Sequence, residues 1–189
     1  IIQKIFTDEK LNKKLITNLT SKLTLSTDYT MDKSIIALAK MSKNLTHVNL
    51  RDCRKTNTSV IFLAKHCPTL THINLREYRW SRPSGIDGRI CIIGDSAVLA
   101  IAHNCPNLKD INLFNCGGIT DASVTALARN CRSLTHVNLN YCDKITDNSV
   151  TVLANNCKDL NHVYLTQNWN ITDASVIALA TKCRDLTHV

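Results

Sequence analysis

One phrase recurs along the chain, and this repetition restricts the possible folds more than any other feature. LTHVNL stands at residues 45–50 and again at 134–139, and close copies begin at Leu70 and Leu160. Alignment on the phrase gives units at 42–66, 67–104, 105–130, 131–156 and 157–182, with a weaker unit at about 17–41. Regular self-similarity of this kind is typical of a solenoid, in which each unit stacks on its neighbours.

Each unit begins with the pattern of a short strand. In residues 131–156, Val137 and Leu139 alternate with His136 and Asn138. Because successive side chains of a strand point to opposite faces, this alternation predicts a strand with one buried face. The same alternation is predicted for the weaker first unit, with Leu23 and Leu25 in the buried positions.

Each unit then continues as a helix. The apolar residues in this part of the unit recur at i, i+3, i+4 and i+7, which is the buried stripe of a helix. They are Val150, Leu153, Ala154 and Cys157. Thr146 or Asp147 suits the N-cap, and Ile145 before it can pack onto Val150.

A single unit of this kind cannot bury its own apolar face, whereas a stack of units can. Stacking joins the strands into one parallel sheet and the helices into an outer layer. Strands lie about 4.8 Å apart and helices need roughly 10 Å, so the stack must bend. We therefore predict an α/β horseshoe with the sheet on its concave face and the helices on its convex face.

The consensus of the units resembles a known repeat. L-x-x-L-x-L-x-x-C followed by I-T-D-x-S-V-x-x-L-A-x-N-C is similar to the cysteine-containing leucine-rich repeat, best known from F-box substrate receptors. The resemblance covers about residues 17–189 and implies a right-handed leucine-rich-repeat solenoid. It also implies the substrate-recognition array of an F-box-type (SCF) ubiquitin ligase receptor. Its partners would be a protein substrate and, if the full chain has an F-box, a Skp-type adaptor and a cullin ligase.

The sequence departs from this pattern in several places. The second cysteine position holds Asp28, Tyr78 and Asn168 in three of the units. Residues 1–16 form a degenerate N-terminal segment, which is either a decayed repeat or an F-box remnant. The last residues, 186–189, repeat only LTHV, so we expect either a cut at Val189 or a second copy covering this edge. Self-association through that exposed repeat edge is therefore possible.

Eight of the nine cysteines occupy two positions of the repeat. Cys67, Cys105, Cys131, Cys157 and Cys183 close the helix stripe, whereas Cys53, Cys116 and Cys142 follow the strands. Positions set by packing, together with an odd total, favour reduced and buried thiols and a cytoplasmic or nuclear protein. Alternation places His136 on the face opposite to its neighbouring cysteines, so we expect neither a metal site nor a cofactor.

Histidines recur at one strand position and asparagines at another. His136, His162 and His188 come from consecutive units, and His47 and His72 form a second group with Asp110 between the two groups. The histidines are either a by-product of repeat duplication or a stripe that senses pH and attracts acids. The asparagine row, which Tyr164 interrupts, suits a solvated binding surface.

The unit at 67–104 carries an insertion at 79–92, with the sequence RWSRPSGIDGRICI. A long loop in a regular array is commonly functional, although a tolerated surface insertion is the alternative. Arg79, Arg82 and Arg89 could bind carboxylate or phosphate, and Trp80 could anchor a partner.

Aromatic residues gather at the strands or just past their ends, where aromatic and arginine side chains favour an interface. Trp169 could instead shield the end of the array. The full set of candidate partner-binding residues is Arg51, Arg76, Arg79, Trp80, Arg82, Arg89, Phe114, His136, Asn138, Tyr141, His162, Tyr164 and Trp169. We expect no catalytic residues, because the motifs of phosphate loops, zinc hydrolases and serine nucleophiles are absent from the sequence.

The sequence therefore predicts a protein–protein interaction module that is not an enzyme and does not enter a membrane. The alternative is a scaffold that binds anions or nucleic acid. It rests on the net charge of +8, whose excess lies in the first hundred residues, and on the arginine-rich loop.

Overall fold

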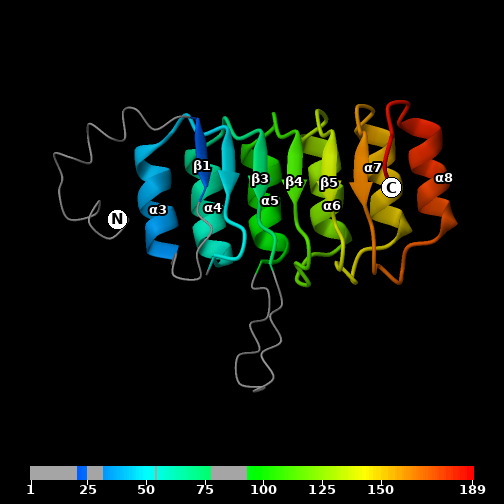
Figure 1. Ribbon diagram of the computed structural model, residues 1–189, viewed down its shortest axis with the longest axis horizontal. Coiled ribbons are helices and arrows are strands. Elements are labelled where there is room, and N and C mark those ends of the chain that lie inside the picture. Colours follow the sequence, from blue (N-terminus) through cyan, green and yellow to red (C-terminus); the bar gives the residue numbers. More distant parts are fainter. Residues whose placement is uncertain (1–20, 25–31, 54, 78–92) are drawn as a thin grey trace, which may run out of the picture.

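The computed structural model describes residues 21–24, 32–53, 55–77 and 93–189. Short strands form one layer and helices lie behind them, and the repeats follow one another in chain order (Figure 1). The strands are β1 (Lys22–Thr24), β2 (His47–Asn49), β3 (His72–Asn74), β4 (Asp110–Asn112), β5 (His136–Asn138) and β6 (His162–Tyr164). The helices are α3 (Asp32–Met41), α4 (Asn57–His66), α5 (Asp95–Asn104), α6 (Asp121–Asn130), α7 (Asp147–Asn156) and α8 (Asp173–Lys182).

The strands form one parallel sheet in the order β1 to β6. Equivalent repeat positions pair across it, so that Leu23 pairs with Val48 and Val48 with Ile73. This register confirms the predicted solenoid, and Leu23 lies in a strand position, as expected for the weaker first unit. Leu25 and Asp28, the other positions predicted for that unit, lie outside the described residues.

The core lies between the two layers and repeats with the chain. Val137 of β5, Leu139 just after it, and Val150, Leu153 and Ala154 of α7 are all at most 1% exposed. Repetition of these positions in neighbouring units gives one continuous apolar cluster along the described repeats. Burial of each such side chain contributes about 1.5–3 kcal/mol, so the predicted strand and helix patterns account for most of the packing.

Contacts between helix starts tie each repeat to the next. Thr146 is the N-cap of α7, as predicted, and its side chain accepts a hydrogen bond from the backbone N–H of Asn148. Its own N–H and Oγ1 donate to the Asp121 carboxylate of the preceding helix, at 2.8 and 2.6 Å. The same contact joins Thr56 to Asp32, Thr120 to Asp95 and Thr172 to Asp147.

The cysteine positions are buried and carry free thiols in every described case. Cys131 Sγ donates to the carbonyl of Cys105, and Cys157 Sγ to that of Cys131. Cys142 Sγ donates in the same way to Leu113 O. In the next repeat Asn168 replaces the cysteine, and its Nδ2 donates to the equivalent Leu139 O at 2.9 Å. A buried amide therefore fills a thiol position by keeping its hydrogen bond.

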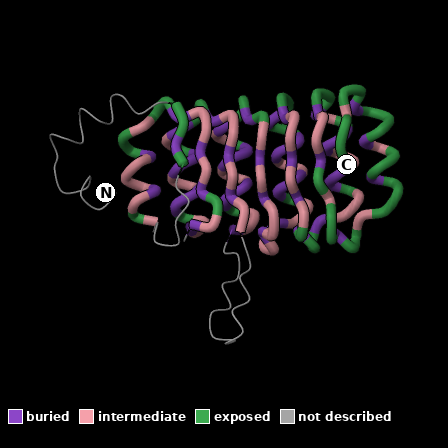
Figure 2. Tube along the Cα trace, in the orientation of Figure 1, coloured by how far each residue is buried: buried purple, intermediate pink, exposed green. Residues whose placement is uncertain are grey.

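The C-terminal end of the array is the less covered one. Val176 and Ile177 of α8 are 41% and 64% exposed, and much of this helix is coloured as exposed in Figure 2. His188 forms an isolated bridge with His162, so the final LTHV begins a strand position beside β6. Trp169 is 80% exposed, which is too much for the alternative role of shielding this end.

None of the described helices is both long and apolar enough to cross a bilayer.

Candidate partner-binding face

The concave face is the surface of the sheet that points away from the helices. Alternation along each three-residue strand places the first and third side chains on it and the second in the core. The first positions are Lys22, His47, His72, Asp110, His136 and His162, and the third positions are Thr24, Asn49, Asn74, Asn112, Asn138 and Tyr164.

Histidines of adjacent repeats stack face to face on this surface. The ring centroids of His47 and His72 lie 4.0 Å apart, and both His136–His162 and His162–His188 are 4.4 Å apart. The parallel register fixes this spacing, because neighbouring strands lie about 4.8 Å apart. The predicted histidine row therefore exists, as a pair and a triplet separated by Asp110.

One nitrogen of each stacked ring is held by the preceding residue. Thr135 Oγ1 donates to Lys109 O at 3.1 Å and lies 2.9 Å from His136 Nδ1. A hydroxyl has one proton, so the ring Nδ1–H must be the donor to Thr135. Asn161 Oδ1 accepts from His162 Nδ1 in the same way, at 2.7 Å. In the neutral rings Nε2 therefore carries the lone pair and is the nitrogen that takes up a proton.

Desolvation, and after it the stacked neighbouring rings, lower the pKa of two of these imidazoles. For His162, desolvation has the largest effect, and the neighbouring His136 and His188 lower the pKa further. For His47, desolvation again comes first, followed by His72 and Lys22. Asp110 acts in the opposite direction on both rings. Both histidines are therefore mainly neutral at neutral pH.

The asparagine row has a structural role that the sequence pattern did not show. Asn138 Oδ1 accepts a hydrogen bond from the backbone N–H of Asn140 at 3.1 Å. Asn49, Asn74 and Asn112 make the same contact with the residue two positions later. An asparagine that bonds its own backbone two residues on stabilises the turn after the strand. Asn138 was predicted to bind a partner, yet its side-chain oxygen already holds this turn.

A second group of predicted residues meets just past the carboxyl ends of strands β3, β4 and β5. The guanidinium of Arg76 lies 4.4 Å from the centroid of the Phe114 ring, and Phe114 lies 5.1 Å from Tyr141. We call Arg76, Phe114 and Tyr141 the edge cluster. Cation–π and tilted aromatic contacts fix such side chains while leaving their outer faces open. Tyr141 is 45% exposed, and the edge cluster therefore offers an aromatic surface.

Tyr141 also has an unusual backbone conformation. Four repeats place a residue with positive φ at this point of the turn, namely Asp52, Asn115, Tyr141 and Gln167, with φ of 57° to 62°. Asparagine and aspartate tolerate this region, whereas a bulky residue there is a genuine outlier. Such strain is often kept where a side chain serves function. Tyr141 thus stands at the edge despite a conformational cost.

Three cations of the described N-terminal repeats are engaged in local contacts. Arg51 pairs with Asp52 at 2.9 Å. Lys55, whose side chain is fully buried, pairs with Glu77 at 2.5 Å. Arg76 stacks on Phe114. These contacts occupy three of the cations on which the nucleic-acid alternative rests.

The remaining predicted site residues fall into two groups. Tyr164 is 37% exposed and its ring lies 6.2 Å from that of His162, whereas Trp169 follows β6 in a loop. The four residues of the insertion, Arg79, Trp80, Arg82 and Arg89, lie outside the described residues, as do Tyr78 and Cys91. The structure therefore joins His136, His162 and Tyr164 on the concave face, and the edge cluster beside them.

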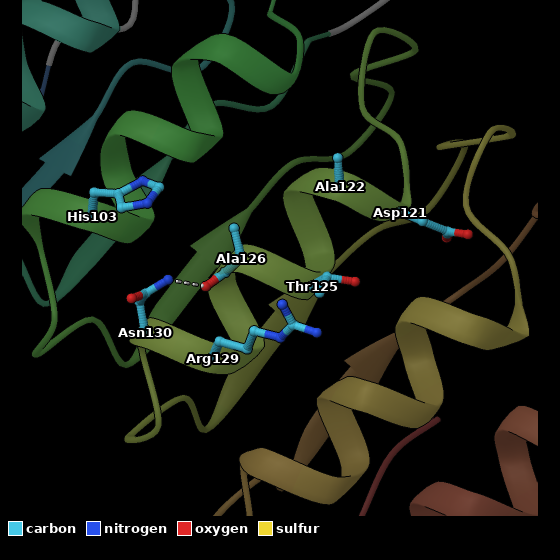
Figure 3. A pocket seen from close by; sticks show the side chains of 7 residues that line it. All are labelled: His103, Asp121, Ala122, Thr125, Ala126, Arg129 and Asn130. Atoms are coloured by element: carbon cyan, nitrogen blue, oxygen red, sulfur yellow. Dashed lines mark hydrogen bonds between the residues drawn. The ribbon is translucent and has the colours of Figure 1, made fainter.

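A shallow hollow of about 430 Å³ lies on the helix side. Figure 3 shows it between His103 of α5 and residues along α6. Two of its polar side chains already have partners: Asp121 accepts from Thr146, and Asn130 Nδ2 donates to Ala126 O at 2.9 Å. Within the described ranges, no group of histidine, cysteine or acidic residues could hold a metal ion.

Comparisons with known proteins agree with this architecture. The family model described as "Leucine Rich repeat" matches residues 104–128 and 130–154. No curated protein sequence matches the chain. A chain of the yeast Rad7 and Elc1 complex superposes with a TM-score of 0.57 at 18% identity, over 95% of this chain and 52% of that one. The tropomodulin C-terminal domain of Caenorhabditis elegans gives 0.55 at 12% identity, over 82% of this chain and 92% of that one.

These similarities extend to the fold and no further. This chain spans about half the length of the yeast chain. The matched repeats and the parallel sheet show that the chain has the fold of a leucine-rich-repeat solenoid. Leucine-rich repeats of this kind indicate a protein-interaction module, and as a class they are scaffolds rather than enzymes.

Proposed function

We propose that this chain is the substrate-recognition array of an F-box-type (SCF) ubiquitin ligase receptor. It would bind a protein substrate across the concave face and the edge cluster. The main observation in support of this binding site is Tyr141, which is exposed and aromatic. Its backbone has a positive φ, a conformation better suited to Asn115, which holds this position in the preceding repeat. Tyrosine, tryptophan and arginine dominate the energetics of protein interfaces.

Exposed aromatic residues that differ from the repeat consensus support this choice of binding face. Asn49, Asn74, Asn112 and Asn138 stabilise turns, but Tyr164 takes the same strand position and is exposed. Phe114 and Tyr141 likewise replace small or polar residues of other repeats. Trp169 adds a further exposed ring. Core packing requires none of these exposed rings, so a partner is the simplest reason for their presence.

The link to a ubiquitin ligase rests on the repeat consensus. The structural neighbour from yeast was solved in a complex with a second protein, which is the arrangement expected of an array that works beside an adaptor. Buried, reduced cysteines suit a cytoplasmic or nuclear receptor. An F-box, with residues 1–16 as a possible remnant, would bind the Skp-type adaptor and through it the cullin.

The test is affinity purification of the full-length protein from its own cells, with mass spectrometry of the bound proteins. We expect Skp and cullin subunits together with at least one substrate. The combined variant Tyr141→Asn, Tyr164→Asn and Trp169→Ala should lose the substrate and keep the adaptor. Asparagine suits the positive φ at position 141 and is the ordinary residue at position 164, so the fold should be retained.

Ile177→Ala is the matched control, because it removes an equally exposed apolar side chain from the helix layer. It should leave both groups of bound proteins unchanged. Retention of the substrate by the triple variant would refute the proposed binding face. Absence of Skp and cullin subunits from the wild-type sample would refute the ligase assignment while leaving the binding face open to test.

A further inference from the structure

The described part of the concave face has little permanent negative charge. Its strand positions carry histidines, amides and Lys22, and Asp110 is the one acid among them. Two acids just past the strands are paired: Asp52 with Arg51 and Glu77 with Lys55. Protonation of the histidines would therefore turn this face from nearly neutral to strongly positive.

The triplet His136, His162 and His188 is the longest uninterrupted part of the row. Consecutive rings are 4.4 Å apart and nearly parallel, with interplanar angles of 10° and 12°. Nδ1 of each ring is held by the residue before it, which is Thr135, Asn161 or Thr187. A proton taken up therefore goes to Nε2, and the three rings become neighbouring N–H donors of charge-assisted hydrogen bonds.

We propose that this triplet binds an acidic segment of a protein partner, and that this binding strengthens as the pH falls. The inference rests on the proposed function, since it assigns a chemical class and a pH dependence to the partner of the same face. The carboxylates of the segment would accept from Nε2–H of the stacked rings.

Binding and protonation are coupled on this row. Stacked imidazolium rings repel one another, and after desolvation of His162 itself the neighbouring His136 and His188 lower the pKa of His162 further. A carboxylate placed against two rings removes this repulsion and favours the charged form. Thermodynamic linkage makes this coupling reciprocal. If protonation of the rings increases their affinity for the acidic segment by some factor, the bound segment increases the proton affinity of the rings by the same factor.

The other charged groups that face the row modulate this effect without reversing it. Asp110 pairs in register with His136 and with His72, and so opposes an incoming carboxylate at one end of the triplet. Lys22, His47 and His72 lie beyond Asp110 and favour the carboxylate. The helices pack against the opposite side of the sheet, so their charges do not face the row.

An acidic protein segment fits the described face better than a nucleic acid does. Binding to a phosphate backbone relies on lysine and arginine, which are charged at every physiological pH. On the described surface Arg51 and Arg76 are held by Asp52 and Phe114. Tyr164 beside His162, and the edge cluster, supply the aromatic contact area typical of a protein interface.

The test uses a fluorescent aspartate peptide of about ten residues as the probe, because its carboxylates stay charged at both about pH 5.5 and about pH 7.5. We expect anisotropy to give roughly tenfold tighter binding at the lower pH, which is what three exposed ion pairs of ordinary strength supply. Calorimetry in buffers of different ionisation enthalpy should show proton uptake on binding.

The variant His136→Gln, His162→Gln and His188→Gln should lose the tighter binding at low pH and the proton uptake. The control variant His66→Gln with His103→Gln removes histidines from the helix layer, where Nδ1 contacts a backbone carbonyl, and should keep both effects. Circular dichroism of each variant at each pH checks that it is folded.

Equal affinity at both pH values would overturn the inference, and so would a triple variant that binds as the wild type does. If a single-stranded oligonucleotide of similar length bound more tightly than the aspartate peptide at both pH values, the anion-scaffold alternative would replace this inference. Loss of substrate in the aromatic variant, with no pH-dependent peptide binding, would sustain the proposed function and refute this inference alone.

Discussion

The contact between Asp121 and Thr146 allows a quantitative test of how the repeats are held together. Substitution of Asp121 by alanine removes the acceptor of the Thr146 N–H at 2.8 Å and of its Oγ1–H at 2.6 Å. Asp173 is the matched control, because it starts α8 as Asp121 starts α6, and the described chain has no further helix after it. Both variants lose an acid from the first turn of a helix.

The two losses differ in magnitude. A hydrogen bond to a charged group contributes about 1.5–3 kcal/mol, and partial burial of this site favours the lower value for each bond. Asp121→Ala should therefore lower the free energy of unfolding by about 3 kcal/mol beyond the shared loss at the helix terminus. That shared loss is about 0.5 kcal/mol, which is all that Asp173→Ala should show. For a chain of this size the difference corresponds to roughly 8 °C in Tm.

Urea unfolding followed by circular dichroism measures the global effect in both variants. Hydrogen exchange of the Thr146 amide gives the local effect, and it should accelerate in Asp121→Ala alone. The chain contains its own precedent: Gly94 replaces the threonine in one repeat, and Asn57 there accepts from its N–H alone, at 2.9 Å. Equal destabilisation by the two variants, with an unchanged Thr146 amide, would refute this account of repeat coupling.

Three other predictions follow from the same structure. Burial raises the pKa of Cys105, Cys131 and Cys157 to about 12, so these thiols should stay unreactive toward a disulfide reagent until urea unfolds the protein; rapid labelling of them in the folded state would contradict this. Glu77→Ala should lower the unfolding free energy by about 3 kcal/mol, because it leaves the buried Lys55 charge unpaired. The double variant Lys55→Met with Glu77→Leu removes both charges and should restore most of this loss, as measured by urea titration. The lowered pKa of His47 and His162 means that the unfolded chain binds protons more readily, so Tm should fall as the pH drops below about 6.5. His162→Gln should flatten this decline, and an identical pH profile would exclude His162 as a cause.

The fold was predictable from the sequence because the same strand and helix patterns recur in several units. Alternation at Val137 and Leu139 and helical spacing from Val150 to Cys157 recur in unit after unit. Each copy is an independent indication of the same strand and helix, so one weak unit, such as that of Leu23, can be placed by its neighbours. Periodicity reports burial, and burial is what decides the positions of strand and helix in this chain.

Contacts between repeats were less predictable from the sequence. The pairing of Asp121 with Thr146 joins residues 25 positions apart, and only the register of stacked repeats brings them together. The role of Asn138 was similarly missed, because an asparagine on a strand can equally face a ligand or hold its own turn. The sequence signal for the first contact was the recurrence of an acid at one helix start and a threonine at the next. The signal for the second was the recurrence of asparagine at the same strand position.

The candidate site follows a different logic from the fold, since it lies where the repeat rule is broken. A position that supports the core or the turn keeps the same residue from repeat to repeat, as Asn49, Asn74 and Asn112 do. Tyr164 replaces such a residue without a gain in packing. Tyr141 is an exposed aromatic residue at the turn position with positive φ, where Asp52, Asn115 and Gln167 stand in other repeats. Because the surrounding solenoid holds its shape through many equivalent contacts, it can tolerate a strained residue in one turn. Repetition therefore stabilises the scaffold, and the departures from it indicate where a partner binds.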